Sequence, residues 1–318
     1  MNKNISRTAE IARLKKLDRR YEDLSKYCRN LNLQVLLGQV GAVYNRESII
    51  DTLQKILLRR NKANILLTGA AGCGKTAIAE GLAHRITEIN LKWRKQVSEE
   101  EAEMLDEALD LKRYSRTPLP LFADCIVYEL SMNALLSGCK YRGEFEEKLQ
   151  KVMDIVAADK NIILFVDEIH QINDIGTAEG GATAGMGQIM KPALARNEIR
   201  LIGATTTQEA EKYIKTDKAL MRRFTEVIVP QIQGESAVQC LEKIMVDYAE
   251  YHDVKIKGVD AKTLLEKVQY FIPDGIFPNN VIDIIDETLA AAKFDGKKIV
   301  KMAEIIQTLS RITGLVIC

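Results

Sequence analysis

The sequence predicts an α/β protein, with a parallel five-stranded sheet sandwiched by helices and then a small all-helical domain. Three observations support this fold class. Strand-length apolar runs alternate with helix-length segments after Gly38, a glycine-rich octapeptide at 69–76 joins an apolar run to a helix-forming one, and strand signals stop after Pro230. We therefore expect an N-terminal amphipathic helical segment at 1–36, a large α/β domain at 37–230 and a helical domain at 231–318.

Five strands are expected in the large domain. Their apolar runs are continuous rather than alternating, which is typical of a parallel sheet covered on both faces. The runs lie at 63–68, 125–130, 161–166, 199–204 and 226–229.

Helical periodicity surrounds these strands. Apolar residues spaced by three and four predict one amphipathic helix over 10–31, which we expect to pack on the protein's own core rather than form a short coiled coil. The polar stretch 90–117 predicts an inserted charged helix beginning at a Ser98–Glu101 capping box, as a solvated decoration more than a partner-docking element. Helices over 234–318 are expected to break at Pro273, Gly275 and Pro278.

Composition restricts the class of protein. The 318 residues carry a net charge near +1, which gives no electrostatic footprint for nucleic acid. Six cysteines without a C-x-x-C pair, and three histidines, favour reduced thiols over a disulfide frame or zinc site. No run approaches the roughly 18 apolar residues of a membrane span, and no secretory signal is visible, so we expect a cytoplasmic protein.

Residues 69–76 read Gly-Ala-Ala-Gly-Cys-Gly-Lys-Thr and satisfy G-x-x-x-x-G-K-[ST]. Backbone N–H groups of such a loop can surround phosphate oxygens, and the following helix directs its positive dipole end at the same anion. Lys75 adds a charge near the β- and γ-phosphates, and the Thr76 hydroxyl can ligate Mg²⁺. The sequence thus predicts a nucleoside triphosphate site that includes Gly69, Gly72, Cys73, Gly74, Lys75, Thr76 and Ala77.

Polar residues follow two other predicted strands. Asp167 and Glu168 come directly after 161–166, where Asp167 can hold Mg²⁺ through water and Glu168 can polarise the attacking water. Thr205 and Thr206 follow 199–204, and a polar residue at this strand end can position water or contact the γ-phosphate. Arg222 and Arg223 precede the last strand; the residues alone leave open whether they are surface cations or reach a neighbouring subunit's nucleotide.

Several motifs in order resemble the Clp/heat-shock unfoldase family of AAA+ ATPases, in particular its first ATPase ring. The resemblance covers about residues 24–316 apart from the insertion. It is carried by the segments 24–31, 69–82, 140–149, 163–170, 178–181, 191–196, 202–206, 222–224 and 277–287.

The resemblance implies specific roles. Lys75 and Thr76 correspond to Walker A, Asp167 and Glu168 to Walker B, and Thr206 to sensor 1, with ATP and Mg²⁺ as cofactors. Arg222 and Arg223 correspond to arginine fingers acting on a neighbour in a ring, expected to be a hexamer. The axial pore loop corresponds to Lys140, Tyr141, Arg142 and Gly143, the second pore loop to 174–187, and the adenine side to Val43, Tyr44 and Ile282.

The chain also departs from the family pattern. Where the family has Val-Ile-Gly-Arg, this chain has Val43-Tyr44-Asn45-Arg46, and where the family has Pro-Asp-Lys, it has Pro278-Asn279-Asn280. No arginine occupies a sensor 2 position there. Cys73 replaces a small apolar residue. A recognition domain before residue 24 and a second ring are missing, and we expect a natural short form rather than an excised ring.

The predicted function is an ATP-dependent protein unfoldase that threads polypeptide through an axial pore. Protein substrates, self-association and an adaptor or Clp-type partner are the expected interactions, without membrane or nucleic acid. Two alternatives stay open: an ATP-binding regulatory or capping subunit of a larger Clp-type ring, and a nucleic-acid-handling AAA+ loader. The paired fingers and Glu168 disfavour the first, and the near-neutral charge disfavours the second. The substrate, adaptor and any peptidase are not identified by the sequence.

Overall fold

We describe the protein from a computed structural model. It describes residues 2–97, 101, 104–105, 115–139, 142–171, 190, 192–194, 196 and 198–317, and the side chains of all of these except 2–6 and 142. The described chain forms two compact units. The first comprises residues up to Thr68 together with Thr76–Ile228, and the second comprises Gly69–Lys75 with Val229–Cys318.

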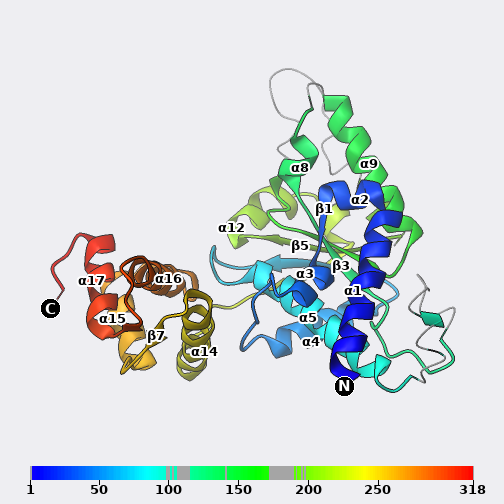
Figure 1. Cartoon of the computed structure of the whole chain (residues 1–318). Helices are drawn as coiled ribbons and strands as arrows, with labels where there is room; N and C mark the ends of the chain where they lie inside the picture. Colours follow the sequence, from blue (N-terminus) through cyan, green and yellow to red (C-terminus); the bar gives the residue numbers. More distant parts are fainter. Residues whose placement is uncertain are drawn as a thin grey trace. The chain divides into compact units, whose positions relative to one another are not determined.

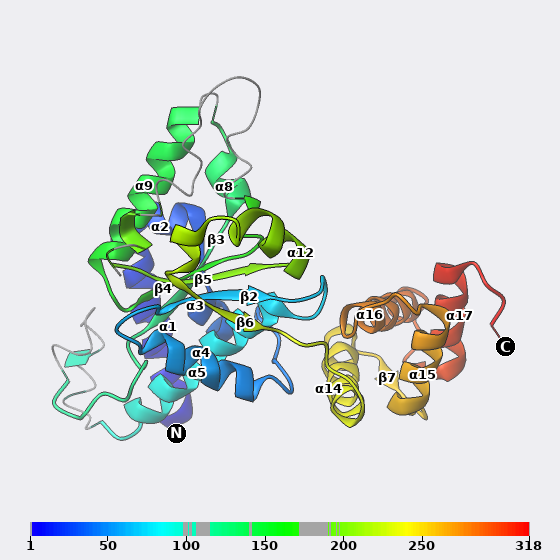
Figure 2. The same ribbon diagram turned by 180° about the vertical axis from the view of Figure 1, so that it is seen from behind.

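The first unit is built around a six-stranded sheet (Figures 1 and 2). Its spatial order is β1-β3-β4-β5-β2-β6, and all neighbours are parallel except β1 and β3. The five parallel strands confirm the predicted sheet. The strands are β1 (Cys28–Asn30), β2 (Asn64–Thr68), β3 (Ile126–Leu130), β4 (Ile162–Val166), β5 (Arg200–Thr205) and β6 (Phe224–Ile228).

Every residue of β2 and β4 is buried, as expected for central strands covered on both faces. Helices α1 and α3 lie on one face, in front of the sheet in Figure 1 and behind it in Figure 2. The helical elements of this unit are α1 (Asn2–Arg20), α2 (Glu22–Tyr27), α3 (Leu31–Leu37), α4 (Glu47–Leu57), α5 (Lys75–Arg94), α8 (Met132–Leu136), α9 (Arg142–Ala158), α12 (Thr207–Glu209), the π-helix η1 (Ala210–Ile214) and α13 (Lys218–Met221).

The prediction of a single helix over 10–31 was wrong. The helical path ends at Arg20, resumes in α2, and then gives way to β1, which pairs antiparallel with β3 at the sheet edge. Asn30 ends this strand and caps α3, since its side chain accepts a hydrogen bond from Leu33 N at 3.0 Å. Asn30 pairs with Tyr128, which is 98 residues away in the sequence. This strand pairing outweighs the local helical periodicity of residues 28–30.

The N-terminal helices belong to the same core as the sheet. Leu14, Leu17 and Leu24 are buried in one cluster with residues of β3, β4 and β5. The apolar stripe of α1 therefore packs on the protein's own core and does not form a coiled-coil seam.

Only part of the predicted insertion is described. Helix α5 continues to Arg94, and Trp93 packs against Leu105 in a small buried cluster. The Glu101 carboxylate accepts hydrogen bonds from the backbone N–H groups of Arg116 and Thr117, which holds the chain returning to β3. The expected Ser98 cap lies outside the described residues.

The second unit is helical apart from one short parallel strand pair, and it breaks between α15 and α16 as the prolines predicted. Apolar faces of α14, α15, α16 and α17 form its core, with Leu241, Leu264, Ile285 and Leu309 fully buried. Its elements are α14 (Glu235–His252), β7 (Lys255–Ile256), α15 (Ala261–Phe271), α16 (Asn279–Phe294), β8 (Ile299–Val300) and α17 (Met302–Thr313).

Among the described helices, none combines the length and apolar character that crossing a bilayer requires.

Candidate nucleotide-binding and hydrolysis site

The phosphate loop leaves the buried strand β2 and enters α5 at Lys75. Gly72 and Gly74 have φ angles of +75° and +90°, a region that a side chain makes costly. At Gly69 a Cβ atom would lie 2.6 Å from the carbonyl oxygen of Val229. The backbone therefore requires glycine at these positions, and the resulting bare N–H groups at a helix start suit phosphate.

Lys75 folds back over this loop. Its Nζ donates to the carbonyl oxygens of Gly69 at 3.2 Å and Ala70 at 3.0 Å, and the residue is only 7% exposed. An ammonium group this buried needs acceptors, which the loop carbonyls supply here and phosphate oxygens could supply instead. Cys73 is fully buried under the loop, and Ala77 is half-buried in the first turn of α5.

Thr76 and Asp167 lie together. The Thr76 hydroxyl donates to Asp167 Oδ2 at 2.5 Å, although 91 residues separate them. Asp167 directly follows the buried strand β4, so its carboxylate is fixed at the carboxyl end of the sheet. A hydroxyl and a carboxylate are hard oxygen donors of the kind Mg²⁺ prefers, so this pair fits that ion. Mg²⁺ bound there would neutralise charge on phosphate oxygens.

Glu168 follows with an unusual backbone. Its φ is +49°, which is uncommon outside glycine and is typical of functional sites. Its N–H donates to Asp167 Oδ1 at 2.9 Å, and its side chain is 44% exposed. The carboxylate can thus be reached by water next to the Thr76–Asp167 pair, as a general base requires.

The polar end of β5 uses its two threonines differently. Thr206 caps α12 in a capping box: its hydroxyl donates to Glu209 Oε2 at 2.7 Å and accepts from Glu209 N at 3.2 Å. Hydrogen bonding from Thr206 lowers the pKa of Glu209. Thr205 is fully buried and contacts both Glu209 and His170. The sensor role of Thr206 stays a prediction, since its hydroxyl is occupied by the helix cap.

Arg222 and Arg223 follow α13 and precede the edge strand β6. Arg222 is exposed and Arg223 half-buried. Within the described part of the chain, no ion pair joins either guanidinium to a carboxylate.

The predicted axial pore loop lies only partly within the described residues. Lys140, Tyr141 and the second loop at 174–187 lie outside the described residues. Arg142 begins α9, and Gly143 is exposed in its first turn.

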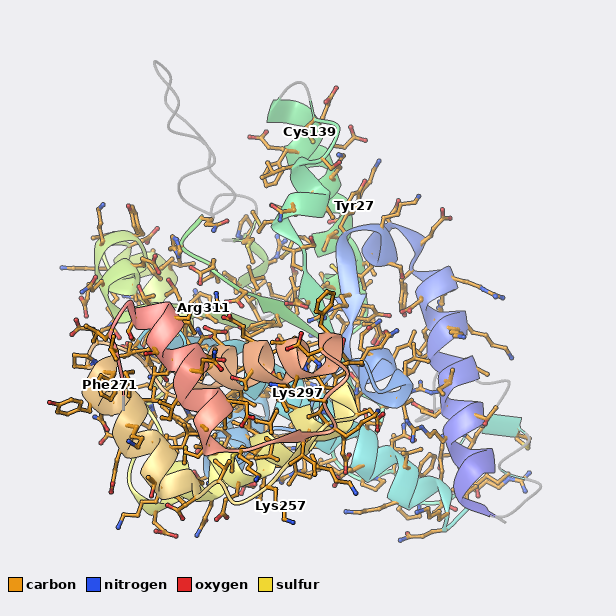
Figure 3. The ribbon with its side chains drawn as sticks, turned by 60° about the vertical axis from the view of Figure 1, so that its left-hand side comes forward. Tyr27, Cys139, Lys257, Phe271, Lys297 and Arg311 are labelled. Atoms are coloured by element: carbon orange, nitrogen blue, oxygen red, sulfur yellow. The ribbon has the colours of Figure 1, made fainter. Side chains whose placement is uncertain are left out.

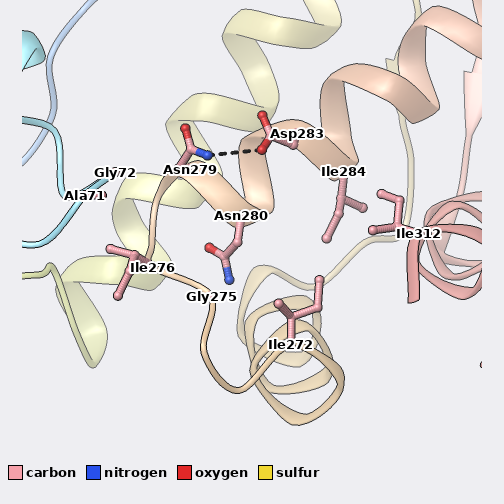
Figure 4. A pocket seen from close by; sticks show the side chains of 10 residues that line it. All are labelled: Ala71, Gly72, Ile272, Gly275, Ile276, Asn279, Asn280, Asp283, Ile284 and Ile312. Carbon is pink, nitrogen blue, oxygen red and sulfur yellow. Dashed lines mark hydrogen bonds between the residues drawn. The ribbon is translucent and has the colours of Figure 1, made fainter. Parts of the chain in front are cut away.

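The second unit contains a pocket of about 430 Å³ beside the phosphate loop (Figure 4). Four isoleucines form apolar walls, and Asn279 donates to Asp283 at 3.1 Å on its polar side. A mainly apolar pocket with few polar groups is typical of a small-molecule site. Its lining residues are Ala71, Gly72, Ile272, Gly275, Ile276, Asn279, Asn280, Asp283, Ile284 and Ile312.

The predicted adenine-side residues are divided between the units. Val43 and Tyr44 are half-buried before α4 in the first unit, and Val43 lies against Gly81 of α5. Ile282 is half-buried in α16 of the second unit, between the pocket-lining residues Asn280 and Asp283.

Two polar residues near Glu168 were missed by the sequence analysis as site residues: His170 and Glu209. Their ligating atoms lie close together, with His170 Nδ1 3.3 Å from Glu168 Oε2 and 3.4 Å from Glu209 Oε2. The chain has only three histidines, and one of them stands two residues after Glu168, so the sequence did contain a signal for His170. Glu209 stands three residues after Thr206, which is the spacing of a capping box, so it too had a signal in the sequence.

Two family descriptions match the chain in this order. "ATPase family associated with various cellular activities (AAA)" matches residues 65–231, and "AAA lid domain" matches residues 233–314. The first covers the whole constellation from the phosphate loop to the arginine pair, and the second covers the helical unit.

Curated relatives and solved structures agree with these matches. The chain is 39% identical over 276 residues to chaperone protein ClpB of Bacteroides thetaiotaomicron, covering 86% of this chain and 29% of the relative. It is 37% identical over 288 residues to ClpB of Aquifex aeolicus, covering 91% of this chain and 25% of the relative. The chain thus spans less than a third of the length of these relatives.

Two solved structures of Hsp104 are similar to most of the chain. One, with ATPγS and FITC casein, has a TM-score of 0.73 at 30% identity, covering 92% of this chain and 45% of that one. The other, an ADP complex from S. cerevisiae, has a TM-score of 0.71 with the same identity and coverage. The chain belongs to the AAA ATPases, in the branch that includes the Clp-type chaperones and carries the AAA lid.

Proposed function

We propose that this protein uses ATP hydrolysis to unfold or remodel other proteins as part of a ring, drawing polypeptide through an axial pore. The observation that carries the proposal is the pairing of Thr76 with Asp167, with Glu168 beside them at the edge of the sheet. Similarity to ClpB and to Hsp104, one structure of which contains casein, supports a polypeptide substrate. A cytoplasmic location and a hexameric ring are parts of the same proposal.

The residues divide the work. The loop N–H groups and Lys75 would bind and neutralise the phosphates, and Thr76 and Asp167 would hold Mg²⁺. Glu168 orients the attacking water and accepts its proton, and Arg222 or Arg223 of a neighbouring subunit stabilises the developing charge. Tyr141 offers a flat amphipathic surface that contacts extended polypeptide without reading its sequence.

Lys75→Ala and Glu168→Gln test the ATPase part of the proposal. Lys75→Ala should lose ATP affinity because a phosphate-neutralising charge is removed. Glu168→Gln should bind ATP like wild type but hydrolyse it slower by on the order of 10²–10⁴-fold, because the general base is gone. Nucleotide titration and steady-state turnover measure the two effects. Wild-type turnover in Glu168→Gln would show that the Walker B assignment is wrong.

Tyr141→Ala tests the polypeptide part. Unfolding of a fluorescent protein with a disordered tail is measured beside ATPase rate, and Tyr141→Phe is the matched control. Tyr141→Ala should keep ATPase turnover and lose unfolding, while Tyr141→Phe keeps most of it, since the aromatic surface is retained. ATPase activity without any unfolding by wild type, but with altered unfolding by added ClpB, would favour a regulatory subunit. Stimulation by DNA would favour a loader.

A further inference from the structure

His170 lies in a buried polar cluster next to Glu168. The residue is 9% exposed, and its ring stacks on Tyr213 of η1 with centroids 5.9 Å apart. Its Nδ1 atom lies 2.9 Å from Thr205 Oγ1 and 3.3 Å from Glu168 Oε2. The ring is therefore held on one side by β5 and η1, and it presents the same nitrogen to the carboxylate.

The hydrogen bonds fix which form of His170 is present. Thr205 Oγ1 donates its single hydrogen to Glu209 Oε2 at 3.0 Å. A hydroxyl that has given away its hydrogen can only accept from a second partner, so Nδ1 must carry a hydrogen and donate to Thr205. The same nitrogen lies 3.3 Å from Glu168 Oε2, so its single hydrogen is shared between the Thr205 hydroxyl and this carboxylate. The negative charge of Glu209, 3.4 Å away, favours a hydrogen on Nδ1.

The backbone around Glu168 is fixed independently. Ile169 N donates to Ala204 O of β5 at 2.9 Å, and its side chain sits on Gly203, where a Cβ would lie 3.0 Å from Ile169 Cγ2. The Glu168 side chain, in contrast, is partly exposed and has several rotatable bonds. A rigid donor is the kind of group that orients such a carboxylate.

We propose that His170 is a positioning residue for ATP hydrolysis: its Nδ1–H, anchored by Thr205 and Glu209, orients the Glu168 carboxylate toward the attacking water. This inference rests on the proposed role of Glu168 as the general base. Glu209 accepts hydrogen bonds from Thr205 and from Thr206, so the contacts that hold His170 also connect Glu168 with Thr206.

A pair of substitutions separates the Nδ1 donor from the bulk of the ring. In His170→Asn the side-chain amide can place a donor near the position of Nδ1, whereas in His170→Gln it reaches the position of Nε2. A misplaced catalytic group costs up to roughly 10²-fold in rate. We expect kcat to fall about ten- to a hundredfold in His170→Gln and no more than about threefold in His170→Asn, with KM and nucleotide affinity unchanged in both.

A double variant shows whether His170 acts through Glu168. Adding His170→Gln to Glu168→Gln should lower the residual rate no further, because the oriented group is already gone. A further fall by the same factor would overturn the inference, as would equal kcat values for His170→Asn and His170→Gln. If Glu168→Gln itself hydrolysed ATP at the wild-type rate, the role of Glu168 would fail first, which distinguishes the two hypotheses.

Folding is controlled in the same series. Each variant's melting temperature is compared with wild type, and Thr205→Val serves as a second probe, since it removes the anchoring hydroxyl while keeping the side-chain shape. Thr205→Val should lower kcat in the same direction as His170→Gln. Wild-type kcat in a folded Thr205→Val would contradict the anchoring by Thr205.

Discussion

At the scale of single residues, burial decides how the polar groups and thiols of this protein behave. Lys75, Thr205 and His170 are buried, and each has oxygen acceptors or donors placed within hydrogen-bond distance. The thiols show the same control by environment. Cys28 in β1 and Cys125 directly before β3 are buried, whereas Cys139, after α8, is partly exposed (Figure 3).

Thiol reactivity is the prediction at this scale. Burial raises the pKa of Cys125 to about 11, and burial also raises the pKa of Cys28. Because the thiolate is the reactive species, both should resist iodoacetamide in the folded protein near pH 8. Among the cysteines that the structure describes, Cys139 should be modified first, as mass spectrometry of peptides from briefly treated native protein would show. Modification of Cys125 ahead of Cys139 would contradict the burial of Cys125, which directly precedes β3.

At the scale of elements, the turn after β4 depends on how closely β5 approaches it. Ile169 packs on Gly203, and its N–H donates to Ala204 O at 2.9 Å. Position 203 requires glycine because the Ile169 side chain already fills the space that a Cβ atom would take. Gly203 cannot move away, since its backbone is paired within the sheet.

Gly203→Ala should therefore destabilise the fold and disturb Glu168. Inserting one methyl into a filled site costs roughly 1–3 kcal/mol. Urea unfolding should show this loss, and ATPase turnover should fall with it. Ile169→Val removes the closest methyl, so Gly203→Ala with Ile169→Val should recover part of the stability. A fully stable Gly203→Ala would mean that the turn is not seated on β5.

Helix α1 is held to the first unit by a buried ion network. Arg13 is 1% exposed, donates to both Glu10 oxygens at 2.8 and 3.0 Å, and lies 3.4 Å from Asp124 Oδ1. The Glu10 carboxylate also contacts Arg94 of α5 at 3.0 Å. This network joins α1 to α5 and to the segment before β3.

Removing Arg13 should leave the buried carboxylates of Glu10 and Asp124 without one of their cationic partners. Breaking a buried pair costs about 3–5 kcal/mol, so Arg13→Met should unfold at clearly lower urea. Lys26→Ala, which removes an exposed ion pair with Glu22, is the matched control and should change stability by about 1 kcal/mol or less. Equal effects of the two substitutions would show that α1 is not essential to this unit.

At the scale of the whole molecule, the role proposed for Arg222 and Arg223 requires a neighbouring subunit. Neither guanidinium has an ion-pair partner among the described residues, and an arginine finger contributes on the order of 10³–10⁵ in rate. Replacing Arg222 and Arg223 with Ala should nearly abolish turnover while nucleotide binding is kept. Mixing that variant with Lys75→Ala should restore some activity, because each subunit supplies what its neighbour's interface lacks.

Mixed assembly has to be shown for this test. Native mass spectrometry in the presence of ATP would report both the ring size and the presence of both variants in one ring. Persistent inactivity in mixed rings would contradict action on the neighbouring subunit.

The local sequence determined the phosphate loop, the five parallel strands and the acidic pair after β4. In each case the signal is contiguous: glycine at fixed offsets before Lys75, a continuous apolar run, or two carboxylates at a strand end. Such patterns reflect backbone and burial requirements that neighbouring residues meet together.

Tertiary structure alone decided the rest. The strand β1 exists because Cys28–Asn30 meets β3, and no local pattern announces a partner about a hundred residues away. The contact of His170 with Thr205 joins residues 35 apart, and it depends on β4 and β5 lying side by side in the sheet. Strand order is set by the packing of the entire unit, so which polar groups share one edge of the sheet can be read only from the folded chain.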